Sequence, residues 1–207
     1  MFIAGFSVLV LASCTVSGQA TEEAKPLRSI ATTGTPSPDL IRQTDSVGRP
    51  LPFETRFADR WSGNNDGTAY EPCTADAATA RRRLGIDDSS ARDAAIVNHQ
   101  TVRGCIWDFQ RRRLSSLAQR LGNFDGSLNE YNERQSAGGF AFFPDIRISG
   151  RPVAVFKSDT KSCGTAVKSG SAIITTNVTI IVETPPMIEI CQMAIDYTHA
   201  TIDQMPK

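Results

Sequence analysis

Residues 163–182, CGTAVKSGSAIITTNVTIIV, contain two runs of small and β-branched residues separated by Ser169-Gly170. Runs of this composition, bounded by turn residues, predict β-strands. Two similar runs precede them and are separated by Ser149-Gly150-Arg151. Together these runs predict an antiparallel meander with strands at Asp145–Ile148, Pro152–Phe156, Cys163–Lys168 and Ala172–Val182.

A helix is predicted after the meander, following Pro185-Pro186. Apolar residues recur there at alternating three- and four-residue steps, which places them on one face of a helix. We expect this face to be buried against the sheet, since an apolar helical stripe is usually core. The stripe consists of Ile188, Cys191, Ile195, Thr198, Ile202 and Met205.

Shorter elements are predicted upstream of the meander. Thr74 can cap a short helix that runs to Leu84, with Gly85 well placed just beyond its C-terminal end. We expect this helix to face mostly solvent. Residues Thr101–Arg111 predict a strand, because Val102, Ile106, Trp107 and Phe109 supply its apolar positions.

Two segments lie between that strand and the meander. Residues Ser127–Ser136 predict a polar helix with Leu128 and Tyr131 on its inner face. Residues Leu114–Phe124 fit either a strand that pairs with Thr101–Arg111 or a second helix, and the leucine spacing alone favours the helix. The pattern leaves both alternatives open.

The N-terminal residues 1–13, MFIAGFSVLVLAS, form an apolar run of signal-peptide length that is too short to span a membrane. The run Leu11-Ala12-Ser13-Cys14 resembles the bacterial lipobox. In proteins of that type the cysteine thiol receives a diacylglyceryl group, whose acyl chains anchor the protein in the membrane. From the length of the apolar run and the lipobox-like residues, we expect a signal peptide at 1–13 and lipidation at Cys14. One feature departs from the usual signal peptide, because no Lys or Arg precedes the apolar run.

The region after Cys14 is rich in Thr, Ser, Pro and Gly, as in residues 32–38, TTGTPSP. It shows no apolar period, which is typical of a flexible linker. We expect residues 14–50 to be a lipidated tether and residues 51–207 to form a single α+β globular domain. This arrangement would display the domain on the extracytoplasmic side of the cell membrane.

Apart from Cys14 the chain has four cysteines, Cys73, Cys105, Cys163 and Cys191. An even number in an exported chain predicts two disulfides. Three pairings are possible, and we favour Cys73–Cys105 with Cys163–Cys191, because each closes a loop of moderate length. A zinc site is disfavoured because the chain contains no Cys-x-x-Cys pair and no ligand-like histidine spacing.

These elements together predict an α+β fold. The predicted antiparallel sheet has about four to five strands. It is packed by the C-terminal helix and one or two shorter helices, and it is stapled by two disulfides.

The charge balance argues against a nucleic-acid-binding protein. The chain has 22 basic and 22 acidic residues and a formal net charge of zero, whereas nucleic-acid binding needs a basic surface. We interpret two short basic clusters as solvated ends of helices or strands. They are Arg81-Arg82-Arg83 and Arg111-Arg112-Arg113.

Catalytic motifs are absent from the sequence. We find no Gly-x-Ser-x-Gly elbow, no His-Glu-x-x-His and no phosphate-binding loop. The two histidines, His99 in a loop and His199 on the polar side of the last helix, are expected to be solvated. Asp87-Asp88 lies at a helix end, where carboxylates are usually solvated or capping. We therefore expect no enzyme, no cofactor and no metal.

Two residues that could suggest a ligand site have simpler structural explanations. Trp107, beside Cys105, is typical of an aromatic residue that packs against a disulfide in a small core. Arg151 falls in a Gly-Arg-Pro turn, where we expect an exposed side chain.

Six motifs follow one another along the chain: residues 65–73 (NDGTAYEPC), Leu84-Gly85, residues 103–107 (RGCIW), residues 150–153 (GRPV), Cys163, and the Cys191 helix that ends at Met205-Pro206. Together they resemble the actinobacterial lipoproteins that carry domain of unknown function 3558. The resemblance covers about residues 60–207 and preserves the order of the motifs. It implies a mycobacterial-type cell envelope and an α+β domain, and it implies no activity.

The functional hypothesis is a membrane-anchored envelope lipoprotein with a non-enzymatic domain that binds a protein, a lipid or a small ligand. The alternative is a structural or assembly accessory of an envelope, secretion or signalling complex. An apolar groove able to hold an acyl chain would favour ligand carriage, whereas a flat apolar patch would favour a protein partner.

Overall fold

The computed structural model describes residues 41–98 and 100–207. The predicted signal peptide, Cys14, most of the predicted tether and His99 lie outside the described residues. No helix in the described part of the chain is both long and apolar enough to span a membrane.

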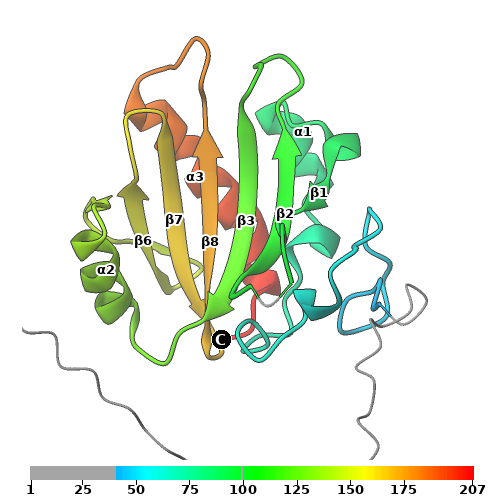
Figure 1. The fold of residues 1–207 in the computed structure, drawn as a ribbon. Coiled ribbons are helices and arrows are strands. Elements are labelled where there is room, and N and C mark those ends of the chain that lie inside the picture. Colours follow the sequence, from blue (N-terminus) through cyan, green and yellow to red (C-terminus); the bar gives the residue numbers. More distant parts are fainter. Residues whose placement is uncertain (1–40, 99) are drawn as a thin grey trace, which may run out of the picture. The chain divides into compact units, whose positions relative to one another are not determined.

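The centre of the fold is one antiparallel sheet of eight strands in the order β1-β2-β3-β8-β7-β6-β4, with β5 paired to β6 (Figure 1). The predicted α+β class and the antiparallel meander are confirmed, as β5 to β8 pair consecutively. The strands are β1 Arg92–Asp93, β2 Arg103–Asp108, β3 Ser116–Asn123, β4 Ala141–Phe142, β5 Ile146–Ile148, β6 Arg151–Lys157, β7 Ser162–Ser169 and β8 Ala172–Thr179.

The predicted strand number of four to five is too low. Two of the additional strands, β1 and β4, have two residues each, which is too short to produce an alternating pattern. The third is β3, the segment for which the sequence left strand and helix open. Leu117 and Leu121, four residues apart, point to the same face of the strand, and Leu114 lies outside it and is 78% exposed.

Helix α3, Met187–Thr201, lies across one face of the sheet, behind β7 and β8 in Figure 1. The predicted terminal helix is therefore confirmed, and so is most of its buried stripe, since Cys191, Thr198, Ile202 and Met205 are buried. Ile188 is the exception, because its side chain is 73% exposed. The buried face is also wider than predicted, since it includes Ile190, Ala194 and Tyr197.

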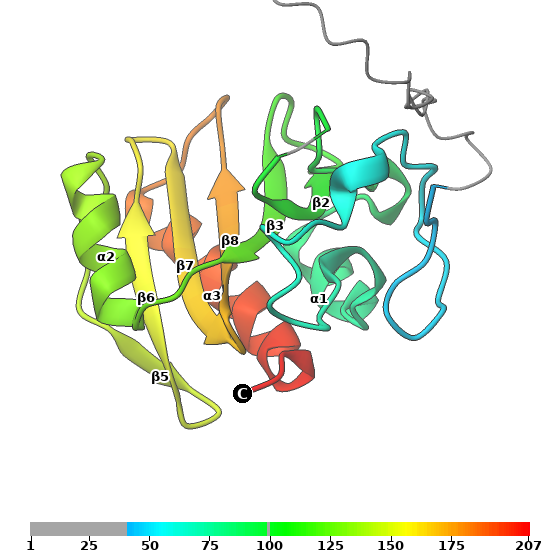
Figure 2. The same cartoon turned by 60° about the horizontal axis from the view of Figure 1, so that its bottom comes forward.

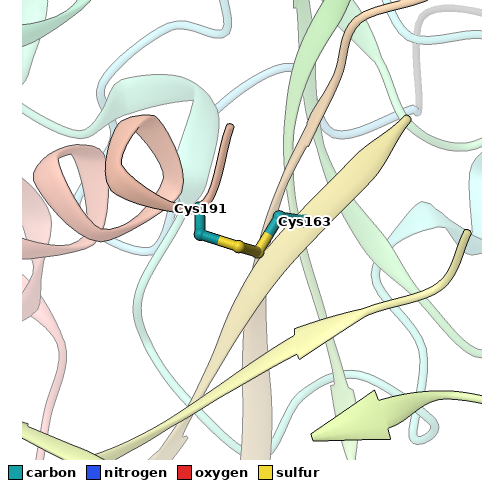
Figure 3. The surroundings of a disulfide bond; sticks show 2 residues. All are labelled: Cys163 and Cys191. Atoms are coloured by element: carbon teal, nitrogen blue, oxygen red, sulfur yellow. A yellow bond between two sulfur atoms is a disulfide. The ribbon is translucent and has the colours of Figure 1, made fainter. Parts of the chain in front are cut away.

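The disulfide Cys163–Cys191 joins β7 to the first turns of α3, with an S–S distance of 2.06 Å (Figure 3). This prediction is confirmed. The predicted bridge Cys73–Cys105 is not formed, and both residues are free, buried thiols that lie near each other. The Cys73 thiol instead donates a hydrogen bond to the Gly104 carbonyl at 3.2 Å. The fold is therefore stapled by one disulfide between described residues.

Two short helices complete the domain. Helix α1, Ala78–Leu84, ends at Gly85, whose φ of +75° is the left-handed conformation that favours glycine, as predicted. Thr74 does not cap this helix. It ends a preceding 3₁₀ turn, Pro72–Thr74, and its hydroxyl donates to Asp45 at 2.7 Å.

Helix α2, Leu128–Ala137, confirms the predicted polar helix. It begins with a capping box in which Ser127 accepts a hydrogen bond from the Glu130 backbone and Glu130 accepts one from the Ser127 backbone. Leu128 is buried and Tyr131 half-buried, as predicted for its inner face.

The last ten residues of the predicted tether, 41–50, lie within the described structure. Thr44 and Pro50 form an isolated β-bridge, and the Leu51 amide donates to the Gln43 carbonyl at 2.9 Å. Asp45 is only 3% exposed. This segment packs against residues of the domain that the sequence placed after residue 51.

Candidate functional site

The fold does not bring together the histidine and aspartate residues that the sequence analysis considered as possible catalytic residues. His199 is exposed, as expected, and lines a shallow hollow between α1 and α3 with Asp196 and Arg83. No serine, threonine or cysteine lines this hollow among the described residues, so it offers no nucleophile for His199 to activate. Asp87 accepts a hydrogen bond from the Ser89 backbone, and Asp88 pairs with Arg81.

Arg81 corrects the prediction that its basic cluster is solvated. It is only 8% exposed, it pairs with Asp88, and it donates to the Tyr197 hydroxyl at 3.1 Å. Its guanidinium lies 5.1 Å from the centroid of the Trp107 ring. Trp107 is buried and packs edge-on against Tyr197, so its role is core packing.

Arg151 also differs from its prediction. Its side chain is half-buried, whereas an exposed side chain was expected. It donates hydrogen bonds to carbonyl oxygens of Ile202, Met205 and Pro206, and also to Lys168. Arg151 therefore fastens the C-terminal residues to the sheet.

The largest group of buried charges lies beside β2 and contains Arg60, Glu71, Asp93 and Arg103, which we call the buried ion cluster. Glu71 accepts two hydrogen bonds from Arg60, at 2.9 and 3.0 Å, and one from Arg103, at 2.7 Å. Asp93 accepts from Arg60 at 3.0 Å. Burial would raise the pKa of Glu71, but the hydrogen bonds and charges of the two arginines lower it.

Every charged group of the buried ion cluster has a partner within the protein. Arg103 also donates to the backbone carbonyls of Asn65 and Thr68. Since its carboxylates and guanidiniums satisfy one another, the cluster holds the loops before α1 against β2. It leaves no group free for a ligand, and we assign it a structural role.

The opposite face of the sheet, which α3 does not cover, is hollowed. Side chains that lie opposite each other in the register point to the same face. Across β3, β8 and β7 one row contains Ala118, Asn177 and Gly164, and the next contains Arg120, Thr175 and Ala166. Because most of these side chains are small, they leave a depression in the middle of this face of the sheet.

Helix α2 lies beside β6 (Figures 1 and 2), and its residues Tyr131, Arg134 and Gln135 line one side of this hollow. Leu128 packs with Phe156 and Ala166 on the sheet, and half-buried aromatic residues extend this side. Phe140 stacks on Phe156, with ring centroids 5.3 Å apart, and Tyr131 contacts Phe124 edge-on. This side of the hollow therefore carries aromatic rings beside the polar side chains of α2.

Two adjoining hollows run between α2 and β3. Their volumes are about 370 Å³ and 340 Å³, and they share four lining residues, Arg120, Tyr131, Gln135 and Thr175. We call the two together the open-face groove. Volumes of this order are typical of small-ligand sites.

Four half-buried polar side chains that line the groove have no hydrogen-bond or ion-pair partner among the described residues. They come from three elements: Arg120 from β3, Tyr131 and Gln135 from α2, and Asn177 from β8. Burial and then the nearby Arg92 charge lower the pKa of Arg120. Burial raises the pKa of Tyr131 to about 12. At neutral pH the groove therefore presents a cation and neutral hydrogen-bonding groups.

No direct signal in the sequence indicates this site. Tyr131 was predicted to face inward, but Arg120 lies in the segment whose structure was left open, and Asn177 was predicted only as part of a strand. Reading Leu114–Phe124 as a strand would have placed Arg120 on the face opposite Leu117 and Leu121. The residues described include no group of three or more His, Cys, Asp or Glu side chains arranged to hold a metal ion.

Comparison with known proteins identifies a family and no activity. No curated protein and no solved structure matches the chain. A family model described as protein of unknown function matches residues 9–204, which extends the resemblance from about residue 60 to a point before Cys14. The chain thus belongs to the DUF3558 family of proteins of unknown function.

Proposed function

We propose that this chain is a lipid-anchored protein of the cell envelope whose domain binds a small or lipid-like ligand in the open-face groove, without catalysing a reaction. The observation that carries the proposal is the convergence of four half-buried, unpartnered polar side chains on one concave surface that aromatic rings also line. Protein surfaces of this kind are the usual ligand sites, because apolar walls supply affinity and a few polar groups fix orientation.

The anchor is supported by sequence. Leu11-Ala12-Ser13-Cys14 resembles a lipobox, and the family match includes this segment. The test is intact-mass analysis and non-reducing peptide mapping of the full chain purified from an actinobacterial membrane. We expect an acylated Cys14 and a Cys163–Cys191 bridge. An unacylated Cys14 in the membrane-derived protein would overturn the anchor.

The binding role is tested by filling the groove. Thr175 is half-buried and lines both hollows, so Thr175→Trp places an indole where the ligand would lie. The matched control is Thr160→Trp, at an exposed position between β6 and β7. Native mass spectrometry of the membrane-extracted chain should show a bound small molecule on the wild type and the control, and none on Thr175→Trp. Equal occupancy of all three would contradict the proposal.

An accessory role through a protein partner is the second candidate. The connection between β8 and α3 and the first turn of α3 expose Ile181, Val182 and Ile188, of which Ile188 is 73% exposed. If this surface docks a protein, Ile188→Glu should remove a co-purifying envelope protein while leaving the groove ligand in place. Loss of the groove ligand alone would argue against this role.

A further inference from the structure

The charge on the open-face groove has one sign. The first hollow is lined by Arg120 and Arg134, and the second by Arg120, and no Asp or Glu belongs to the described lining of either. The whole chain has zero net charge, so this is a local feature of the groove. A concave surface with one sign of charge attracts ligands of the opposite sign.

Arg120 is the residue on which this argument depends. Its neighbours in the sheet register on this face are Thr175 and Ala166, which bring no negative charge. The other arginines that the fold buries, Arg60, Arg81 and Arg103, all pair with carboxylates. A half-buried guanidinium without an anion loses hydration and gains no ion pair, and a bound carboxylate or phosphate would supply one with two parallel hydrogen bonds.

Aromatic rings line part of the groove beside Arg120, among its polar side chains. Tyr131, Phe140 and Phe156 line the second hollow on the side of α2, and Phe124 lines the first. The ring of Phe156 is buried under Phe140, so this part of the groove is fixed by packing. An anion without an apolar part would leave this aromatic surface uncovered and in water.

We infer that the open-face groove takes a single-chain anionic amphiphile, with its carboxylate or phosphate head on Arg120 and its chain along the aromatic rings beside α2. This inference rests on the proposed binding function and names the chemistry of the ligand. Arg134, exposed at the rim of the first hollow, supplies a second and weaker contact to the head. The Gln135 and Asn177 amides donate to oxygens of the same head.

The test compares ligands that share one chain and differ in head group. Decanoate, decyl phosphate and 1-decanol are titrated, below their aggregation concentrations, into the full chain carrying Cys14→Ala, so that no attached acyl chain competes. Backbone amide NMR shifts locate the site, and their concentration dependence gives Kd. We expect shifts on β3, β8 and α2, and weaker binding of decanol than of either anion. Comparison of the two anions shows whether a carboxylate or a phosphate head is preferred.

The variant that tests the role of Arg120 is Arg120→Gln, with Arg113→Gln as the control at an exposed arginine in the turn between β2 and β3. Loss of one charge-assisted contact should weaken binding of the anions by about 10- to 100-fold and leave decanol unchanged. Arg113→Gln should have no effect.

Two results would overturn the inference and are distinguishable. Binding of all three compounds in the groove with equal Kd, unaffected by Arg120→Gln, would remove the anionic head and leave the binding function intact. Absence of groove shifts with every amphiphile would reject the ligand class. The proposed binding function would then depend on the Thr175→Trp experiment, whose readout is the native ligand.

Discussion

The buried ion cluster and the open-face groove both contain arginines, and they differ in what satisfies them. In the cluster, the Arg60 and Arg103 guanidiniums reach Glu71 within 3.0 Å. In the groove, Arg120 has no such partner among the described residues. A buried charge that the protein pairs internally contributes to the fold, whereas one that the protein leaves unpaired is available to a ligand. The same residue type therefore has a structural role in one region, and we propose that it contacts a ligand in the other.

The largest expected effect comes from breaking the cluster. Glu71→Gln keeps the shape of the side chain but removes the negative charge that Arg60 and Arg103 share, so that Arg103 loses its anion and Arg60 keeps only Asp93. We expect the free energy of unfolding to fall by about 3–5 kcal/mol in urea denaturation. Glu133→Gln, at an exposed position on α2, is the control and should change it by less than about 0.5 kcal/mol. A small effect of Glu71→Gln would mean that the cluster is not structural.

Removing the disulfide tests whether stability and ligand binding are independent, because the disulfide lies on the face of the sheet that α3 covers and the groove lies on the other face. Cys163 and Cys191 are 28 residues apart in sequence, and the Cys163→Ala/Cys191→Ala pair removes the cross-link between them. Loop entropy predicts a loss of about 3–4 kcal/mol in unfolding free energy. We expect Kd for decyl phosphate to stay within about twofold, because the proposed ligand contacts lie on the other face. A large rise in Kd would show that the two faces are coupled.

The lowered pKa of Asp45 predicts that the unfolding free energy depends on pH. Burial alone would raise its pKa, but hydrogen bonds from Thr74 and from the backbone of Arg49 and Val47 lower it from 3.8 to about 2. A lowered carboxyl pKa gives stability that is fully present above the unfolded value and is lost as pH falls from about 4 to about 2.

Replacing Asp45 tests this assignment. Asp45→Asn should cost about 1–3 kcal/mol at pH 7, because it weakens the hydrogen bonds to a buried carboxylate. Its unfolding free energy should also fall less steeply than that of the wild type between pH 4 and pH 2. Parallel pH curves for the two proteins would show that Asp45 is not a source of the acid sensitivity.

The smallest expected effect on stability is that of Arg120→Gln. Since Arg120 has no protein partner among the described residues, its replacement should change the unfolding free energy by no more than about 0.5 kcal/mol. Thermal and urea denaturation without ligand measure this directly. A loss as large as that of Glu71→Gln would place Arg120 with the structural arginines and remove the distinction between the two regions.

The sequence analysis predicted those elements whose ends depend on turn and capping residues close together in the chain. The turn at Ser169-Gly170 predicted the β7–β8 hairpin, the Ser127 and Glu130 spacing accords with the start of α2, and Gly85 predicted the end of α1. Each depends on residues a few positions apart. Cys163–Cys191 was predicted from chain position and confirmed.

The parts that were missed depend on partners far apart in the sequence. Glu71 and Arg103 are 32 positions apart, and nothing in the intervening residues indicates that they meet. The leucines of β3 fit a helix as well as a strand, and only pairing with β2 and β8 on both sides decides between them. The groove was missed for the same reason, because β3, β8 and α2 form it together.

The most direct test of the central claim is the thermal unfolding midpoint of the wild type and of Arg120→Gln, each with and without decyl phosphate. A ligand that binds only the folded state, at 100 times its Kd, stabilises that state by about 2.7 kcal/mol. The account predicts that the ligand raises the Tm of the wild type by several degrees and that of Arg120→Gln by much less at the same concentration. Equal increases in both proteins, or none in either, would contradict it.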